Sequence, residues 1–561
     1  MNNPKNMLLI ALFFLGFLLY MQWQVDYGPK PALENNEINQ SASLTNQLDE
    51  DVPQVGNQTT DDIPEVSRFE PVEQAVESVN QRTSGSIITV TTNVLSLKID
   101  TIGGSIVYAE LLKYPVKKKA KENIILLNQN SNRNYYAQTG LLSLKQSFKH
   151  TDIYQAQKEK YEVLSGTIEI PLTIEKEGIK LTKTFTISAD SYLVNMKDTV
   201  QNNSNEVWQG QQYKQLQRSN PWENNTPSFN DPSRMSFAGA AYFEPNEGLV
   251  TLKFDDFSED KINTSIQSEG WIGMLQHYFF TSFILKDSKS DIKSMYLPNS
   301  QTPYLIRATS GFSQAQPGSN TEISTQLYIG PKLQAELPEI AKGLDLTVDY
   351  GIFTVISKPL FWVLDKIHTL VGNWGWSIIL LTILIKLLFF KLTEKQYNSM
   401  ARMRKLQPRI KTLKERHKDN KQKFNEEMMA LYKKEKVNPM GGCLPMLVQI
   451  PVFIALYWVL QESVELRQAP FMLWIQNLSE PDPYFILPAI NAAAMFMTQK
   501  LSPTPGMDPM QAKIMKFMPI GFSVMFAFFQ SGLVLYWAVN SSLSLLQQWV
   551  ITKRIDANDK L

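Results

Sequence analysis

Hydrophobic residues follow a different pattern in each part of the 561-residue chain, and each pattern predicts a different kind of structure. Residues 7–21 are almost wholly apolar and no small-residue cleavage site follows them, so residues 1–25 are predicted to be an uncleaved signal anchor. Residues 26–85 are polar and acidic, which is typical of a disordered tether. An acidic interaction tail is the less favoured alternative.

Residues 86–341 alternate between apolar and polar positions, as in Ile168, Ile170, Leu172 and Ile174. Turn sequences such as Gly103-Gly104 separate the runs. This period of two predicts a large antiparallel β-sandwich with one buried face per sheet. Its histidines have no companion at the spacing of a metal site or catalytic triad. A binding or spacer domain is therefore favoured over a hydrolase or carbohydrate-modifying enzyme.

The pattern becomes helical after residue 341. Apolar residues recur at steps of three and four from Phe353 to Val371, which predicts an amphipathic helix lying on the membrane surface within residues 342–376. Trp374 and Trp376 follow it as predicted interfacial anchors.

Long apolar runs between residues 377 and 551 predict an α-helical, multi-pass membrane core of five spans. Several runs are shorter than the roughly 20 residues that cross a bilayer, which favours a thinned bilayer or a water-filled space beside them. The predicted spans are Ser377–Leu392, Leu444–Leu460, Tyr484–Thr498, Ile514–Phe529 and Leu533–Ile551.

The net charge of +1 hides an uneven distribution, because basic residues greatly exceed acidic ones between residues 392 and 440. The positive-inside rule places this segment in the cytoplasm. Counting spans from it puts both termini, including the short tail 552–561, in the cytoplasm and the β-domain across the membrane. Heptad-like apolar spacing predicts a helical hairpin here, and its apolar stripe and methionines favour a mobile element that docks partners. Glu427, Met428 and Met429, in its second arm, are the predicted docking residues. The alternative is a solvated loop that only sets topology.

Lys386 lies inside the first of these apolar runs, where a charge costs roughly 2.5–3.5 kcal/mol on insertion scales. Thr382 lies one turn before it, on the same helix face. The last predicted span carries Tyr536, Asn540, Ser544 and Gln547 on one face, and Gln449 lies in the second predicted span of the core. Together these residues predict a polar cavity between the spans. Snorkelling of Lys386 to the headgroups and ordinary interhelical hydrogen bonds are the alternatives.

No catalytic motif for a metalloprotease, serine hydrolase, P-loop NTPase or dinucleotide-binding enzyme occurs in the chain. The single cysteine, Cys443, excludes an internal disulfide. We therefore expect a protein that is not an enzyme and needs neither a cofactor nor a metal. A small-solute transporter or channel remains an alternative, as does a scaffold that tethers the β-domain.

Several blocks of sequence resemble the Gram-negative form of the YidC/Oxa/Alb family of membrane protein insertases. The resemblance covers essentially the whole chain. The blocks are Gly372-Asn-Trp-Gly-Trp-Ser377, Met428-Met-Ala-Leu-Tyr432, Lys436-Val-Asn-Pro-Met-Gly-Gly-Cys443, Gln449-Ile-Pro-Val-Phe453, Glu465-Leu-Arg-Gln-Ala-Pro470 and Ser531-Gly-Leu-Val-Leu-Tyr536.

The resemblance implies an inner-membrane insertase and chaperone that passes nascent membrane proteins through a hydrophilic groove into lipid, alone or with the Sec translocon. It also implies a periplasmic β-supersandwich related to sugar-binding folds. The ribosome and signal-recognition machinery, acting on the cytoplasmic loops, and membrane lipids are expected partners. No recognition of a nucleic acid sequence is expected.

By motif position, the resemblance assigns the groove to Lys386, Thr382, Gln449, Tyr536 and Trp537, and we group Asn540 with them. The chain departs from the family at three of its positions. Lys386 stands where Arg is common, Trp537 where Tyr is often found, and Lys391 where a Pro often follows the cation.

Overall fold

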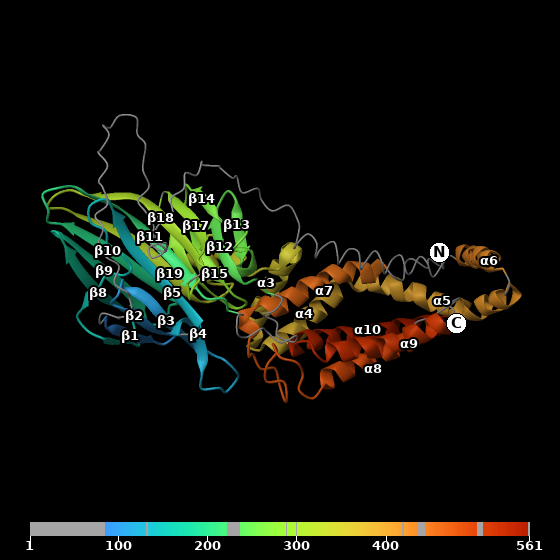
Figure 1. Ribbon diagram of the computed structural model, residues 1–561. Helices are drawn as coiled ribbons and strands as arrows, with labels where there is room; N and C mark the ends of the chain where they lie inside the picture. Colours follow the sequence, from blue (N-terminus) through green and yellow to red (C-terminus); the bar gives the residue numbers. More distant parts are fainter. Residues whose placement is uncertain are drawn as a thin grey trace. The chain divides into compact units, whose positions relative to one another are not determined.

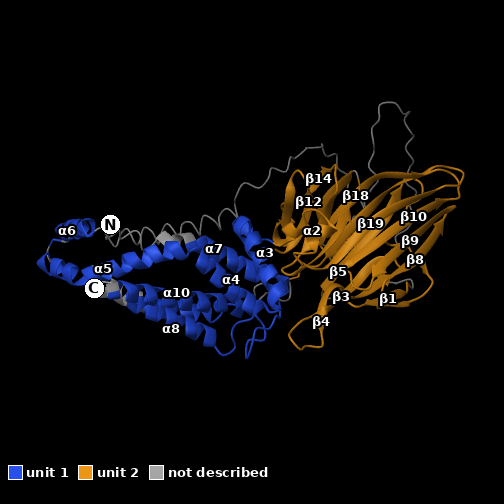
Figure 2. Ribbon diagram, turned by 180° about the vertical axis from the view of Figure 1, so that it is seen from behind, with its two compact units in different colours: residues 1–35, 349–561 blue, residues 36–348 orange. Residues whose placement is uncertain are grey.

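The computed structural model describes most of the chain after residue 84. The predicted N-terminal anchor, nearly all of the predicted tether and the loop with Cys443 lie outside the described residues. The chain forms two compact units that divide near residue 348, one of strands and one of helices (Figure 2). The described residues are 85–130, 133–221, 236–287, 289–298, 300–417, 420–435, 444–501 and 509–558.

The unit of strands is a sandwich of two large sheets (Figure 1). The ten-stranded sheet runs in the order β14 (Asn263–Ile266), β17 (Ser290–Tyr296), β18 (Tyr304–Ala315), β11 (Trp208–Arg218), β5 (Arg133–Ser143), β4 (Asn123–Asn130), β3 (Ser105–Pro115), β2 (Leu95–Asp100), β1 (Ile87–Thr92), β7 (Lys160–Val163). The nine-stranded sheet runs in the order β13 (Gly248–Lys253), β12 (Gly239–Glu244), β15 (Gly270–Leu275), β16 (Phe279–Leu285), β19 (Asn320–Pro331), β10 (Leu193–Asn202), β9 (Ile179–Ser188), β8 (Thr167–Lys176), β6 (Gln155–Ala156).

The strands differ in how many of their faces are buried. β9 alternates strictly between buried and half-buried residues, as its sequence predicts, and it pairs antiparallel with β8 and β10. β12, β15 and β16 are instead buried on both faces, so the expectation of one buried face per sheet is wrong for these strands. The expectation of purely antiparallel pairing is also wrong, because β7 pairs parallel with β1.

A fully buried lysine links the two sheets of the sandwich. Lys183 of β9 donates hydrogen bonds to the Gly103 carbonyl (2.8 Å) and to both the carbonyl (3.3 Å) and the hydroxyl (2.8 Å) of Thr139 in β5. Asp198 is its cross-strand neighbour on β10 and accepts a hydrogen bond from Gln212 of β11. Burial lowers the pKa of Lys183, and the charge of Asp198 partly offsets that effect.

The unit of helices contains those after residue 353, and α10 packs against most of them. The helices are α3 (Thr354–Val371), α4 (Trp374–Leu388), α5 (Phe390–Arg416), α6 (Lys421–Lys434), α7 (Leu444–Glu462), α8 (Ile486–Leu501), α9 (Pro509–Phe526) and α10 (Ser531–Asn558). Short helical segments, α2 (Leu337–Ile340), η3 (Leu344–Thr347) and η4 (Gly351–Phe353), precede α3, and η6 (Val464–Leu466) follows α7. Within the described residues, no single helix is both long and apolar enough to cross a membrane, although α4 and α5 together are.

The first predicted span of the core ends earlier than its apolar run suggests. α4 ends at Leu388, and α5 leaves it at an angle of 67°. Phe389 forms the joint with φ −91° and ψ 8°, and the Thr393 hydroxyl donates to the carbonyls of Phe389 and Phe390. These local hydrogen bonds compete with a continuous helix, so the bend forms without a proline.

α5 and α6 form the predicted helical hairpin. A hydrophobic cluster joins the two arms, with Leu406 and Ile410 on α5 packed with Phe424, Met428 and Tyr432 on α6. Asn420 caps the start of α6, because its side-chain oxygen accepts a hydrogen bond from the Lys423 amide.

The segment between α7 and α8 ties together the starts of α4 and α10. Asn373, which caps α4, donates a hydrogen bond to the Phe471 carbonyl at 3.0 Å. The amide of Gly532 donates to the Leu478 carbonyl at 2.9 Å, and Ser531 donates to Asn477 at 2.8 Å. These bonds fix one end of α4 beside one end of α10.

Candidate functional site

Lys386 points from α4 toward α10 and is held there by a hydroxyl. Its Nζ donates a hydrogen bond of 2.7 Å to Ser544 Oγ. The Ser544 hydroxyl in turn donates to the Asn540 carbonyl one turn earlier in α10, at 2.7 Å. None of the ion pairs among the described residues includes Lys386, so its neighbours are neutral oxygens.

Further polar contacts connect the same face of α10 to two other helices. Gln449 of α7 donates to Asn540 Oδ1 at 3.1 Å, and Gln547 donates to Thr393 Oγ1 of α5 at 2.7 Å. Side chains from α4, α5 and α7 therefore converge on one polar stripe of α10. The spacing of four residues from Asn540 to Ser544 and of three from Ser544 to Gln547 keeps these groups on one face of the helix.

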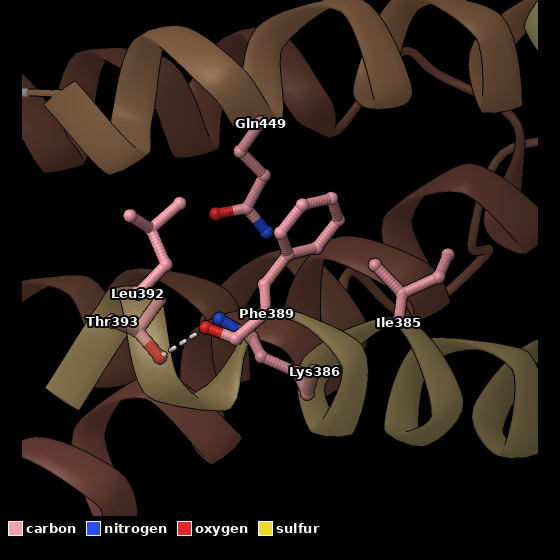
Figure 3. Close-up of a pocket in the computed structure, with 6 residues that line it drawn as sticks. All are labelled: Ile385, Lys386, Phe389, Leu392, Thr393 and Gln449. Atoms are coloured by element: carbon pink, nitrogen blue, oxygen red, sulfur yellow. Dashed lines mark hydrogen bonds between the residues drawn. The ribbon is translucent and has the colours of Figure 1, made fainter.

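A small pocket lies beside Lys386 (Figure 3). Apart from the ammonium, the Thr393 hydroxyl and the Gln449 amide, its walls are apolar. Its volume of about 10 Å³ is the space that roughly one water occupies, so any larger group enters only when these side chains move. The lining residues are Ile385, Lys386, Phe389, Leu392, Thr393 and Gln449.

The other predicted groove residues are more buried than an open groove requires. Thr382 is buried, and its hydroxyl donates to the Ile378 carbonyl of its own helix at 2.6 Å. Tyr536 is only 1% exposed and stacks on Phe453 with ring centroids 6.4 Å apart. Trp537 is half-buried against Phe453, at 4.6 Å between ring centroids. Aromatic packing therefore occupies this part of the predicted groove.

The two predicted tryptophan anchors have different surroundings. Trp376 is 45% exposed and meets the ring of Phe471 edge-on, so it keeps the exposed ring that an interfacial anchor needs. Trp374 is buried and stacks on His368 with ring centroids 3.9 Å apart, so its ring packs between α3 and α4. Burial lowers the pKa of His368, and the nearby Asp365 partly opposes this.

The three hairpin residues predicted to dock partners also differ in exposure. Met428 is buried in the cluster between α5 and α6, and Met429 packs partly exposed against it. Glu427 lies 3.1 Å from His417 across the hairpin, measured between Oε2 and Nε2. Burial raises the pKa of Tyr432 in the same cluster. Met428 thus holds the hairpin together, while Met429 and Glu427 have accessible atoms.

Sequence reasoning left out several residues of this site. Ser544 and Gln547 share the polar face predicted for the last span, but the predicted groove does not include them. Thr393 lies seven residues after Lys386, a spacing of two helical turns that indicates a shared side. Phe389 carried no such signal, because it lines the pocket only as a result of the bend.

The side chains of this site can act on a ligand only by electrostatic attraction and hydrogen bonding. The pocket offers one cation, one hydroxyl and one amide, and no nucleophile paired with a base. Among the described residues, no group of three or more His, Cys, Asp or Glu side chains could hold a metal ion. The site can attract and solvate an anionic or polar group between otherwise apolar helices.

Comparisons with known proteins match both units of the chain. The family model described as 60Kd inner membrane protein matches residues 366–558, and the model described as YidC periplasmic domain matches residues 87–363. The membrane protein insertase YidC of Thioalkalivibrio sulfidiphilus is 42% identical over 575 residues, covering 100% of both chains. The same-named protein of Methylococcus capsulatus is 42% identical over 564 residues, covering 100% of this chain and 99% of its own. A solved YidC insertase with its first transmembrane domain resolved is 18% identical, covers 82% of this chain and 92% of its own, and overlays with a TM-score of 0.39.

Proposed function

The chain belongs to the YidC family of membrane protein insertases, and from that membership we propose how its residues carry out insertion. It is an insertase of the inner membrane with a periplasmic β-sandwich domain and a helical C-terminal region. The proposal concerns its membrane topology, the role of the polar stripe on α10 and the partners that use it.

We propose that α4, α7, α8, α9 and α10 are the five spans of the insertase core. The basic excess in α5 and α6 supports a cytoplasmic hairpin, with both chain termini on the same side. α10 is less apolar than a typical span because it carries polar residues such as Asn540, Ser544 and Gln547. These are the residues that contact α4, α5 and α7, so their polarity is satisfied inside the bundle.

Lys386 is the proposed receptor for an incoming polypeptide. A nascent chain with an acidic or polar N-terminal tail enters beside Lys386 and replaces the hydroxyl of Ser544 as its partner. At an effective dielectric constant near 20, two unit charges about 4 Å apart attract by roughly 4 kcal/mol. The hydrophobic segment that follows then leaves sideways into lipid, while the tail crosses the thinned membrane. No nucleotide is used in this sequence of steps.

One observation carries this proposal. Lys386 is a cation that donates its hydrogen bond to a neutral hydroxyl, and polar groups from α5, α7 and α10 surround it. A structural charge would be expected to have an acidic partner, because an uncompensated buried charge is costly. A charge kept next to neutral, replaceable oxygens is suited to a transient acidic ligand.

The same proposal identifies the molecules with which the protein works. Nascent membrane proteins are the substrates, and the Sec translocon joins for those that need it. The ribosome and the signal-recognition machinery meet the hairpin at its accessible residues, including Met429 and Glu427. Membrane lipids receive the released helices.

Replacement of Lys386 tests the proposal. Insertion of a Sec-independent single-span substrate with an acidic tail is measured in vesicles for the Arg, Ala and Glu variants of Lys386. We expect Arg to retain insertion, Ala to lose most of it and Glu to lose more. Lys391→Ala, an exposed lysine five residues later, serves as the control. If the Glu variant inserts the substrate as well as the native protein does, attraction by Lys386 is not the mechanism.

A further inference from the structure

The loop that joins β3 to β4 is unusually basic. Five lysines and one glutamate lie between residues 113 and 123, in a chain whose total charge is only +1. We call residues 113–123 the lysine hairpin. Lys113, Lys117, Lys119 and Lys121 are exposed, and none of the described ion pairs involves them. Within the β-sandwich, the lysine hairpin projects beyond the edges of the sheets (Figure 1).

The lysine hairpin has a defined structure. The amide of Val116 donates to the Glu122 carbonyl at 2.8 Å, and the amide of Ala120 donates to the Lys117 carbonyl at 2.9 Å. At its base, the Tyr114 ring packs edge-on against Phe279 with centroids 5.4 Å apart, which attaches it to the other sheet. The lysines are therefore presented together on a turn of fixed shape and not on a loose chain.

Apolar side chains accompany the lysines. Val116 is 44% exposed and Ile125 is 43% exposed, although both lie in or next to paired backbone. A surface that needed only solubility would gain nothing from exposing these two residues beside so many charges. Basic and apolar groups together are the combination that binds the interface of an anionic bilayer.

We propose that the lysine hairpin docks the β-domain onto the anionic surface of the lipid bilayer. The chain is an inner-membrane protein, so a lipid surface is always within reach of its periplasmic domain. Each lysine near such a surface strengthens binding by roughly fivefold, and Val116 and Ile125 add apolar contact. The acidic segment 26–85 of the same chain is the other possible occupant. Its acids are scattered in small groups over some sixty residues, whereas a bilayer presents closely spaced charges.

Lipid quenching of a fluorescent label tests the docking. The full chain carries Cys443→Ser, which removes its only native thiol, and Val116→Cys as the labelling site. It is placed in nanodiscs of phosphatidylcholine, with or without phosphatidylglycerol, that contain lipid with a quencher near the headgroup. A label at Leu164→Cys, 63% exposed on the same domain, is the position control.

We expect stronger quenching at Val116→Cys in the phosphatidylglycerol discs, and little change at Leu164→Cys. Combining Lys117→Gln, Lys119→Gln and Lys121→Gln should shift the docking equilibrium by roughly a hundredfold toward the free form. The matched pair Lys158→Gln and Lys160→Gln, two exposed lysines elsewhere on the domain, should leave it unchanged.

Equal quenching in neutral and anionic discs would overturn the proposal, as would insensitivity to the triple variant. Deletion of residues 36–80 distinguishes the bilayer from the acidic segment as the group that binds the lysine hairpin. If that deletion exposes a Val116→Cys label that was shielded in detergent without lipid, the acidic segment is the partner and lipid docking is excluded. Insertion activity measured on the same variants reports on the site around Lys386 independently.

Discussion

Lys386 and Ser544, 158 positions apart in the chain, are joined by a hydrogen bond of 2.7 Å between Nζ and Oγ. Because the Ser544 hydroxyl donates its own proton to the Asn540 carbonyl, its lone pairs are left to accept from the ammonium. This arrangement orients Lys386 toward α10 without neutralising it.

Replacing Ser544 separates orientation of the cation from its charge. Ser544→Ala removes the acceptor of a charge-assisted hydrogen bond, a contribution of about 1.5–3 kcal/mol. We expect a lower melting temperature in detergent and partial retention of insertion, since the charge of Lys386 remains. Ser542→Ala, an exposed serine of the same helix, should change neither property. Loss of insertion as complete as in Lys386→Ala would mean that orientation matters more than charge.

The close contact between Gly375 and Phe471 predicts that the helical unit loses stability when Gly375 is replaced by a larger residue. A Cβ atom added at Gly375 would overlap the Phe471 ring, so Gly375→Ala should destabilise the helical unit by about 1–3 kcal/mol through overpacking. Thermal unfolding in detergent measures the loss, and adding Phe471→Ala should restore part of it.

Gly521 provides the matched control for this substitution. It also lies inside a helix, α9, but a Cβ there has no atom within 4 Å. Gly521→Ala should therefore be neutral or stabilising by up to about 1 kcal/mol, because alanine restricts the unfolded backbone. A similar loss of stability in both variants would show that helical glycine itself, and not the Phe471 contact, is the cause.

The hydrophobic cluster between α5 and α6 predicts a local change in the stability of α6. Met428 is buried between α5 and α6, and truncating a buried methionine costs about 2–5 kcal/mol. Met428→Ala should therefore speed hydrogen exchange of amides across Lys421–Lys434 while leaving α10 unchanged. Glu426→Ala, at an exposed position of the same helix, is the control. Unchanged exchange in the Met428 variant would show that the hairpin holds together without the cluster.

Lys183 predicts how the stability of the β-domain depends on pH. Its pKa is lowered by burial, so between that lowered value and 10.5 the unfolded chain holds a proton that the folded domain has lost. Stability should rise with pH through this window and be lower below it. Stability is measured only up to about pH 9.5. Burial raises the pKa of Tyr135 to about 12, and at higher pH such buried tyrosines make stability fall as the pH rises.

Urea unfolding followed by the β-sheet circular dichroism of the full-length protein measures this dependence. Lys183→Met should flatten the rise with pH, whereas Lys253→Met, at an exposed position of β13, should keep it. A rise that persists in the Lys183 variant would assign it to other groups.

Much of the fold follows from local sequence patterns. The period of two in Ile168–Ile174 corresponds to β8, and the apolar runs near Leu444 and Leu533 correspond to α7 and α10. The pairing of strands depends on contacts between distant segments, so the parallel β1–β7 pair had no local signal. The burial of β16 on both faces also depends on contacts with distant segments, so the local pattern did not predict it.

In the candidate site, too, local spacing predicts some features and only packing determines the others. The polar residues of α10 share a face in any helix, so their grouping followed from spacing alone. Which groups they meet depends on packing, and the Gln547–Thr393 pair could only be seen once α5 was placed. The exposure of Tyr536 was also beyond the sequence, because the ring of Phe453 that covers it belongs to another helix.

The joint at Phe389 has a structural consequence. A proline kink removes an amide donor permanently, but here the amides of Phe389 and Thr393 both keep carbonyl partners, at Ile385 and Phe389. The bend between α4 and α5 therefore leaves both of these amides satisfied. α5 continues from this joint into the hairpin with α6, so Phe389 is both the start of that arm and a wall of the pocket beside Lys386.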